Sequence, residues 1–411
     1  MKIAVLGAGI SGLGAAYLLS RTHEVDLYEK ASRLGGHART TMVEEAGRRF
    51  GVDTGFLVFN HETYPLLTRL FEQLDVAVDK SDMSFGFWDE TTDVAYNGQS
   101  LGGMFLQKRN LFSPVHWSMI RDILRFNKNA NADVDGDRVG ARVTLGDYLR
   151  PYGEAFRQRY LIPMGAAIWS TPSDRMHDFP ARTFLRFFKN HGLLGVTTQH
   201  QWLTVRGGSV QYVNKIKERV SGRIVTDSDV TAVRRDADGT VLVRRDGTAQ
   251  RYDKVILAMH APDALALLED PSDAEREILG AFAYKENDAV LHTDPRALYP
   301  DRRLYAAWNY KTGGNKDAVT LSYWINRLQN LPGERDYFVS LNETTALDRV
   351  VERIRYAHPQ FDRRAIAAQA RRGEISGVRN TYYAGAYWRY GFHEDGLWSA
   401  NTIAAELGGA L

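Results

Sequence analysis

The 411-residue chain contains no cysteine. This absence excludes disulfide bonds, thiolate metal sites and a redox-active dithiol, and no metal site is predicted. The chain also lacks any apolar run near the roughly 20 residues that cross a bilayer. The apolar opening from Ile3 to Leu19 has no basic leader and carries glycines at turn positions, so it does not resemble a signal peptide. We therefore expect a cytoplasmic protein, free in solution or resting on the inner face of the membrane.

An excess of charge of one sign is also missing. The 52 Lys and Arg residues nearly balance the 50 Asp and Glu residues, so we expect no general nucleic-acid binding, and any basic patch must be local. At 44% hydrophobic and 25% charged residues, the composition is that of an ordinary globular protein. A chain of this length exceeds the size of a single core, which predicts two domains.

What the sequence does contain, at its start, is a glycine turn between a strand and a helix. The apolar run 2–6 suits a buried parallel strand, and the helical pattern 13–21 follows the turn. In such a turn the first glycine permits a tight bend, the second lets the backbone approach a pyrophosphate, and the third allows close helix packing. The helix N-terminus supplies free N–H groups for phosphate. The predicted cofactor contacts here are Gly7, Gly9, Ile10, Ser11 and Gly12.

An acidic residue ends the next predicted strand. Residues 24–29 form a second predicted strand that closes with Glu29, seventeen positions beyond Gly12. A carboxylate there accepts hydrogen bonds from ribose hydroxyls and repels a 2′-phosphate. Glu29 is therefore predicted to bind an adenosine ribose, and NADP is disfavoured.

A second glycine pair follows the ribose carboxylate and favours FAD over NAD. A longer cofactor that crosses the sheet needs further N–H groups and cations near its pyrophosphate, which the segment 33–39 could supply. A charged surface turn is the alternative interpretation of this segment alone. The predicted cofactor residues in this segment and just before it are Lys30, Arg33, Gly35, Gly36, His37 and Ala38.

These motifs, in this order, resemble those of the flavin-containing amine oxidase superfamily. The resemblance extends through 53–55, 206–209, 224–232 and 381–385. It implies FAD and an α/β fold, α+β overall, in which a Rossmann-like FAD-binding domain accompanies a discontinuous mixed substrate domain. The expected FAD-binding domain comprises residues 1–80, 202–265 and 375–411, and the substrate domain comprises residues 81–201 and 266–374.

The resemblance also assigns cofactor contacts outside the N-terminal unit. In the superfamily a final helix points its N-terminus at the flavin, and the sequence predicts this helix over 397–407. The sequence departs from many relatives at His37, where they have arginine, which leaves the pyrophosphate contacts open. The residues that the resemblance implies as cofactor contacts are Val230, Gly385, Asp395, Gly396 and Leu397.

The expected substrate domain is rich in aromatic residues. Segments 160–172, 308–310 and 322–326 suit either core packing or a hydrophobic tunnel. Two other stretches, 105–128 and 184–194, mix cations with apolar bulk. Each suits a helix in a membrane interface or an ordinary amphipathic helix packed on the core.

Several longer motifs resemble one bacterial subgroup of the superfamily. They include VDTGFLVFN at 52–60, YLIPMGAAIWS at 160–170 and YWRYGFHEDGLWSA at 387–400. The subgroup is described as NAD/FAD-binding proteins associated with cyclopropane-fatty-acid synthases, and some members resemble methylated-fatty-acid desaturases of furan fatty acid biosynthesis. The resemblance implies a hydrophobic lipid substrate, a phospholipid acyl chain altered by a methyltransferase, and that methyltransferase as a partner.

Desaturation requires a hydride acceptor, which the flavin provides, and a group that takes one proton. The candidates are His393 and Glu394 beside the predicted final helix, His292, and Lys285. Two rival functions remain open: a flavin amine oxidase, and a non-redox flavoprotein such as a double-bond isomerase or a sugar mutase. A flavin-binding subunit that works with a methyltransferase is a further alternative.

Overall fold

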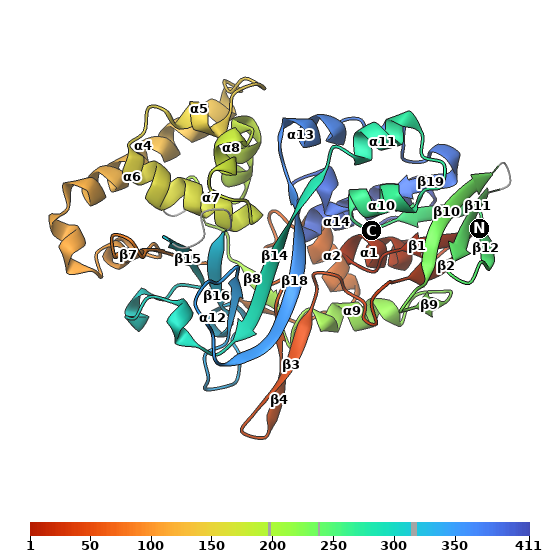
Figure 1. The fold of residues 1–411 in the computed structure, drawn as a ribbon, viewed down its shortest axis with the longest axis horizontal. Coiled ribbons are helices and arrows are strands. Elements are labelled where there is room, and N and C mark those ends of the chain that lie inside the picture. Colours follow the sequence, from red (N-terminus) through yellow and green to blue (C-terminus); the bar gives the residue numbers. More distant parts are fainter. Residues whose placement is uncertain (196–198, 237–238, 314–318) are drawn as a thin grey trace.

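The computed structural model describes residues 1–195, 199–236, 239–313 and 319–411 (Figure 1). These residues form a mixed α/β fold, α+β overall, which confirms the predicted class. The five-stranded sheet lies toward one end of an elongated molecule, helices α4 to α8 form the other end, and the seven-stranded sheet lies between them (Figure 1). The exact division of the chain into two domains stays a prediction.

A five-stranded sheet in the order β19-β13-β1-β2-β9 carries the N-terminal glycine turn, and all of its pairs are parallel. The chain leaves this sheet after β2 and returns to it for each of the other three strands. The five strands are β1 (Lys2–Leu6), β2 (Glu24–Tyr28), β9 (Ile224–Val225), β13 (Lys254–Leu257) and β19 (Thr381–Tyr383).

Both faces of this sheet are covered. Ile3 and Val5 of β1 face one core, and Ala4 and Leu6 face the other, which is why the strand is apolar throughout. The first core includes α1 (Ile10–Leu19), α2 (Pro65–Gln73), α9 (Val210–Lys217) and α14 (His393–Glu406). The second includes β10 (Val230–Asp236), β11 (Gly239–Arg244), β12 (Ala249–Tyr252), α10 (Ala261–Leu267), α11 (Asp273–Leu279) and α13 (Arg363–Gln369).

A seven-stranded sheet in the order β18-β14-β17-β16-β15-β6-β7 forms the second part. Only the β15–β6 pair is parallel. Its strands are β6 (Phe85–Asp89), β7 (Val94–Asn97), β14 (Ala283–His292), β15 (Trp308–Thr312), β16 (Thr320–Trp324), β17 (Phe338–Leu341) and β18 (Val350–Gln360).

A run of helices covers this sheet, and its aromatic side chains fill the largest core. The helices are α3 (Leu101–Met104), η1 (Lys108–Phe112), α4 (Pro114–Asp135), α5 (Leu145–Leu149), α6 (Glu154–Phe156), η2 (Arg157–Leu161), α7 (Ile162–Trp169), η3 (Arg175–Asp178) and α8 (Ala181–Asn190). No helix of the described ranges is both long enough and apolar enough to cross a bilayer.

Smaller elements complete the fold. The hairpin β3–β4 projects from the middle of the molecule, and β5 pairs with β8 (Figure 1). These elements are β3 (Thr40–Glu45), β4 (Arg48–Asp53), β5 (Val78–Lys80), β8 (Leu203–Val205), α12 (Ile325–Gln329), η4 (Pro295–Ala297), η5 (Arg302–Leu304), η6 (Arg372–Glu374), η7 (Val378–Asn380) and η8 (Ala386–Trp388).

Two features join the two large sheets. The long strands β14 and β18 run together through the middle of the molecule (Figure 1). Beside them, the buried Asp53 carboxylate accepts hydrogen bonds from Ser209 N and Oγ and from Gln329 Nε2, so that β4, the start of α9 and α12 meet at one point. Burial raises the pKa of Asp53 to about 7.

Candidate functional site

One cavity of about 1480 Å³ lies between the two parts and is lined by both. This volume exceeds the roughly 300–1,000 Å³ of a typical small-molecule pocket, and suits a dinucleotide together with a second ligand. One end of the cavity, here called the nucleotide end, is lined by residues of the glycine turn and of β2. The other, the aromatic end, is lined by residues of α7, α8 and the segment before α14.

The glycine turn at the nucleotide end has no room for side chains at two of its three glycines. Gly7 has φ +99°, and a Cβ there would lie 2.3 Å from the carbonyl oxygen of Ala258. A Cβ at Gly12 would lie 1.7 Å from the oxygen of Gly7, which explains the close packing of α1 on β1. A Cβ at Gly9, in contrast, would meet nothing within 4 Å. The space beside Gly9 is therefore open, as a phosphate-binding turn requires.

Glu29 lies at the end of β2 and lines the cavity. One of its carboxylate oxygens accepts a hydrogen bond from Ala8 N at 2.8 Å, and the other accepts one from Ala31 N at 2.9 Å. Each oxygen has a second lone pair that can accept from a ribose hydroxyl. The arrangement fits the adenosine end of a dinucleotide.

The second glycine pair lies against the first turn. Gly35 and Gly36 both have positive φ, and a Cβ at Gly36 would lie 3.0 Å from the Cα of Gly9. The Arg33 guanidinium donates to the carbonyl oxygens of Leu34 and Gly36, and so stabilises the loop from within. Burial lowers the pKa of Arg33. The backbone of this loop and the His37 side chain are therefore the groups best placed to contact a ligand.

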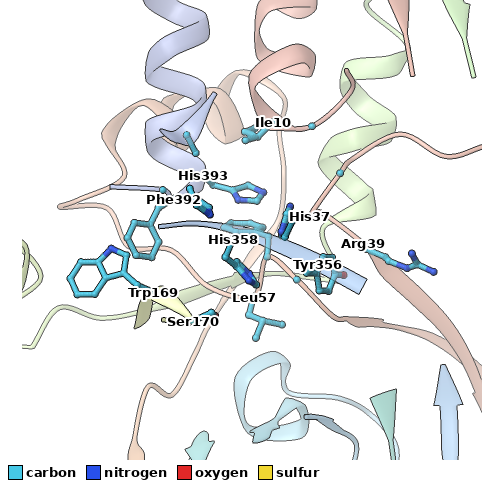
Figure 2. A pocket seen from close by; sticks show the side chains of 18 of the residues that line it. Ile10, His37, Arg39, Leu57, Trp169, Ser170, Tyr356, His358, Phe392 and His393 are labelled. Carbon is cyan, nitrogen blue, oxygen red and sulfur yellow. The ribbon is translucent and has the colours of Figure 1, made fainter. Parts of the chain in front are cut away.

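Three histidines from separate elements converge midway along the cavity (Figure 2). The His37 ring stacks on Tyr356 at a centroid distance of 4.8 Å and lies 5.4 Å from the His358 ring. The His393 ring stacks on Phe56 at 3.8 Å. The Nε2 atoms of His37 and His393 are buried and have no hydrogen-bond partner in the described chain. Such orphaned atoms indicate a ligand at this point.

All three rings are neutral at physiological pH. Burial, together with the neighbouring His358, holds the pKa of His37 well below its usual value. Burial also lowers the pKa of His358 to about 4 and that of His393 to about 3. A neutral imidazole donates at one nitrogen and accepts at the other, so each ring can hold or accept a proton.

The aromatic end is formed by large apolar side chains. Trp169 and Phe392 face this part of the cavity (Figure 2). Trp169 Nε1 donates to the carbonyl oxygen of Tyr390. The Phe187 ring stacks on both Phe392 and His191. The wall is therefore one interlocked aromatic cluster, suited to an apolar ligand.

Most of the predicted cofactor residues line this cavity. They are Gly7, Gly9, Ile10, Ser11, Glu29, Lys30, Arg33, Gly36, His37, Val230 and Gly385. Six others do not line it and act behind its wall: Gly12, Gly35, Ala38, Asp395, Gly396 and Leu397. For these six residues, direct contact with the cofactor stays a prediction.

Asp395, Gly396 and Leu397 do not line the cavity because helix α14 begins at His393 rather than at the predicted Leu397. Gly396 and Leu397 are consequently inside the helix, against α1: a Cβ at Gly396 would lie 2.8 Å from Ser11 Oγ. The Asp395 carboxylate turns back to accept from Tyr390 N and Phe392 N, and so holds the segment that carries the aromatic wall. Burial raises the pKa of Asp395 to about 7.

Of the four candidate catalytic residues, only His393 lines the cavity. Glu394 accepts hydrogen bonds from Leu66 N and Leu67 N and thus caps helix α2, outside the cavity. His292 is buried in the seven-stranded sheet, where Nε2 bonds to Ser340 Oγ and Nδ1 accepts from Asp294 N. Lys285 is exposed on β14, and its neighbours Tyr284 and Glu286 line the cavity in its place. The structure therefore places Glu394, His292 and Lys285 outside the cavity wall, and their catalytic role stays a prediction without support from the geometry.

Sequence reasoning missed several cavity residues that come from distant segments. They are His191, Trp202, His260, Tyr284, Tyr356 and His358. The alternation of Tyr284 and Glu286, and of Tyr356 and His358, on two paired strands was the available signal, since alternate residues share one face of a strand.

Comparison with known proteins agrees with this geometry. Residues 10–325 match the model of a family described as flavin containing amine oxidoreductase. The chain belongs to this family. FAD is accordingly its cofactor, and the chain is an FAD-dependent oxidoreductase of the amine oxidase superfamily. The open space at Gly9, the spare lone pairs of Glu29 and the orphaned His37 and His393 nitrogens fit that group.

Solved structures share the fold over nearly their whole length. A proposed protoporphyrinogen oxidase from Exiguobacterium sp. 255-15 is 17% identical, with a TM-score of 0.71 over 99% of this chain and 98% of that one. A cyclohexylamine oxidase from Brevibacterium oxydans IH-35A is 14% identical, with a TM-score of 0.69 over 99% of each chain. A fatty acid isomerase from P. acnes that produces CLA is 15% identical, with a TM-score of 0.66 over 98% of each chain. At these identities the likeness shows the fold alone. No sequence among curated proteins matches the chain.

Proposed function

We propose that this flavoenzyme oxidises a long apolar substrate, specifically that it desaturates a methylated phospholipid acyl chain. The observation that carries the proposal is the continuity of the cavity: its nucleotide end, where the glycine turn and Glu29 fit FAD, opens directly into a wall of interlocked aromatic side chains. The proposal that the substrate is an acyl chain, and that a methyltransferase modifies it first, rests on the resemblance of the sequence to the bacterial subgroup.

The charges at the aromatic end support an uncharged substrate. Asp82 lines the cavity there, but its carboxylate accepts from Arg327 Nε at 2.7 Å and from Ser84 N at 2.6 Å. A carboxylate that is already paired in this way attracts a substrate ammonium group less strongly. An apolar chain, in contrast, gains free energy from every aromatic surface that it covers.

The proposed chemistry needs one group besides the cofactor. FAD, when bound, supplies a two-electron acceptor. Desaturation removes a hydride from one substrate carbon, to the flavin, and a proton from its neighbour. His393 Nε2 is the proposed proton acceptor because it has no partner in the described chain and lies in the cavity wall.

The test is a single turnover without oxygen. The flavin-loaded protein is mixed with phospholipid carrying methylated acyl chains, and flavin absorbance and lipid mass are followed together. We expect flavin reduction with the loss of two hydrogens per acyl chain. Unmethylated phospholipid of equal chain length is the control. Equal reaction with both lipids would show that the enzyme does not require a methylated acyl chain.

Two other outcomes would overturn it. A lipid product of unchanged mass, with oxidised flavin at the end, would show an isomerase, as in the fatty acid isomerase that has this fold. Inert lipid together with flavin reduction by a panel of amines would show an amine oxidase, the activity named for the cyclohexylamine oxidase.

A further inference from the structure

An unusual apolar surface lies at the helical end of the molecule. Of the ten large apolar side chains that are exposed in the described residues, six lie between residues 101 and 124. Phe112 is 85% exposed, more than any of the others. Contiguous exposed apolar surface is rare on proteins that bind nothing there. We call this surface the apolar–basic face, and it consists of Leu101, Leu111, Phe112, Trp117 and Leu124, with the cations described next.

Cations surround these side chains. Residues 101–130 contain five basic residues and one acidic residue, Asp122. Asp122 is buried, accepts from Gly153 N and pairs with Arg125, and Arg109 pairs with Asp93. Lys108, Arg121 and Lys128 supply the rest of the positive charge. The exposed side of α4 alternates the two kinds of residue, with Trp117, Arg121, Leu124 and Lys128 at helical spacing. The remaining basic residues are Lys108, Arg109 and Arg125.

The face is held in shape from below. Trp117 Nε1 donates to the carbonyl oxygen of Leu111 at 2.9 Å, and the Trp117 ring packs on Phe105 at 4.8 Å. The opposite side of α4 buries Met119, Phe126 and other residues in the large core. The exposed apolar groups are therefore displayed by a fixed scaffold.

The face adjoins the mouth of the cavity. Gly98 and Gln99 line the cavity and are exposed, and Ser100, the next residue, caps the helix that begins at Leu101. A ligand that leaves the cavity past Gln99 would therefore pass close to Leu101 of the apolar–basic face.

We propose that the apolar–basic face docks the protein on an anionic lipid bilayer. Aromatic and aliphatic groups would enter the interface, and the lysines and arginines around them would contact lipid phosphates. The inference rests on the proposed function, since docking here brings the cavity mouth to the place where acyl chains are found. The other stretch with this composition, 184–194, is excluded: Phe184, Leu185, Phe187 and Phe188 are buried.

The test measures vesicle binding of the flavin-loaded full chain, without turnover. Vesicles of phosphatidylcholine, alone or mixed with phosphatidylglycerol, are sedimented with the protein at low and high salt. We expect binding to the mixed vesicles that weakens with salt. The pair Phe112→Ser and Leu124→Ser should weaken it about tenfold or more, and Lys108→Glu with Arg121→Glu should weaken it about fivefold for each cation lost.

Matched controls separate docking from general surface effects. Met42→Ser and Val351→Ser remove other exposed apolar groups outside the face, and Arg48→Glu with Arg49→Glu makes the same charge change on the β3–β4 hairpin. These variants should bind as the parent does. Loss of binding in the controls, absence of binding in the parent, or a changed oligomeric state in the Phe112→Ser variant would overturn the proposal, the last by showing that a second copy covers the face.

The two proposals fail in different ways. If the protein binds anionic vesicles but does not oxidise their lipids, docking stands and the lipid substrate falls. If it oxidises detergent-dispersed methylated lipid but binds no vesicles, the substrate stands and docking falls.

Discussion

The two ends of the cavity are built by different means. At the nucleotide end the backbone makes the site: Gly7, Gly9 and Gly36 leave room where a side chain would intrude, and Glu29 is held by two N–H groups. At the aromatic end side chains from α7, α8 and the segment before α14 make the wall, and each is held by another ring. A backbone site has fixed chemistry, whereas a side-chain wall can change its ligand by substitution.

The largest expected effect follows from filling the backbone site. Gly9→Ala places a methyl group in the open space where the cofactor must pass, while the chain itself meets no clash. We expect a folded protein whose FAD affinity falls by about a hundredfold or more. Flavin content after purification and FAD titration of the apoprotein measure this.

Gly373→Ala is the control, since a Cβ there also meets nothing within 4 Å but lies outside the cavity. Flavin retention by Gly9→Ala equal to that of this control would show that no phosphate passes beside Gly9.

A smaller effect is expected at the aromatic end. Phe392→Leu keeps an apolar side chain but removes the ring that stacks on Phe187. We expect retained FAD and an increase of about tenfold in the KM for an acyl substrate. Steady-state kinetics and flavin content, taken together, decide this. Loss of FAD instead would show that the aromatic end also contributes to cofactor binding, so that the two ends do not act independently.

The histidine between the two ends predicts a dependence on pH. Burial lowers the pKa of His393 to about 3, so the unfolded chain binds a proton below about pH 6.5 that the folded chain does not bind until about pH 3. The neutral, buried His393 therefore costs the folded state nothing above about pH 6.5. As the pH falls below that value, proton uptake by the unfolded chain lowers the free energy of unfolding.

His393→Gln should reduce the loss of stability between pH 7 and pH 5 by about 1 kcal/mol, after allowance for water in the cavity. Urea unfolding at the two pH values measures it. An unchanged pH dependence would contradict the buried, neutral state of His393.

The smallest effect is expected behind the wall. Glu394→Gln removes charge from the group that caps α2, which should cost about 1 kcal/mol or less of unfolding free energy. Turnover should stay within about twofold of the parent. Thermal melting and kcat are the measurements. A large loss of kcat with an unchanged melting temperature would show that Glu394 takes part in catalysis.

The same contrast explains what sequence could predict. Strands β1 and β2, the glycine turn and Glu29 lie within thirty residues, so spacing along the chain specifies their geometry. His37, His358 and His393 come from three distant segments, and no local pattern brings them together. The start of α14 differs from the prediction by about one helical turn, and in the structure the Glu394 carboxylate caps α2 instead of lining the cavity.

The return of the chain to the five-stranded sheet has a consequence for biosynthesis. Helix α1 packs on α14 so closely that a Cβ at Gly14 would lie 2.6 Å from the Leu397 side chain. On the ribosome, α1 is made early and α14 last of all the helices in the described chain. The apolar surface of α1 must wait, uncovered, while the rest is translated. A nascent chain stalled before residue 381 should therefore depend on chaperones and hold no cofactor, and flavin capture should be among the last events of maturation.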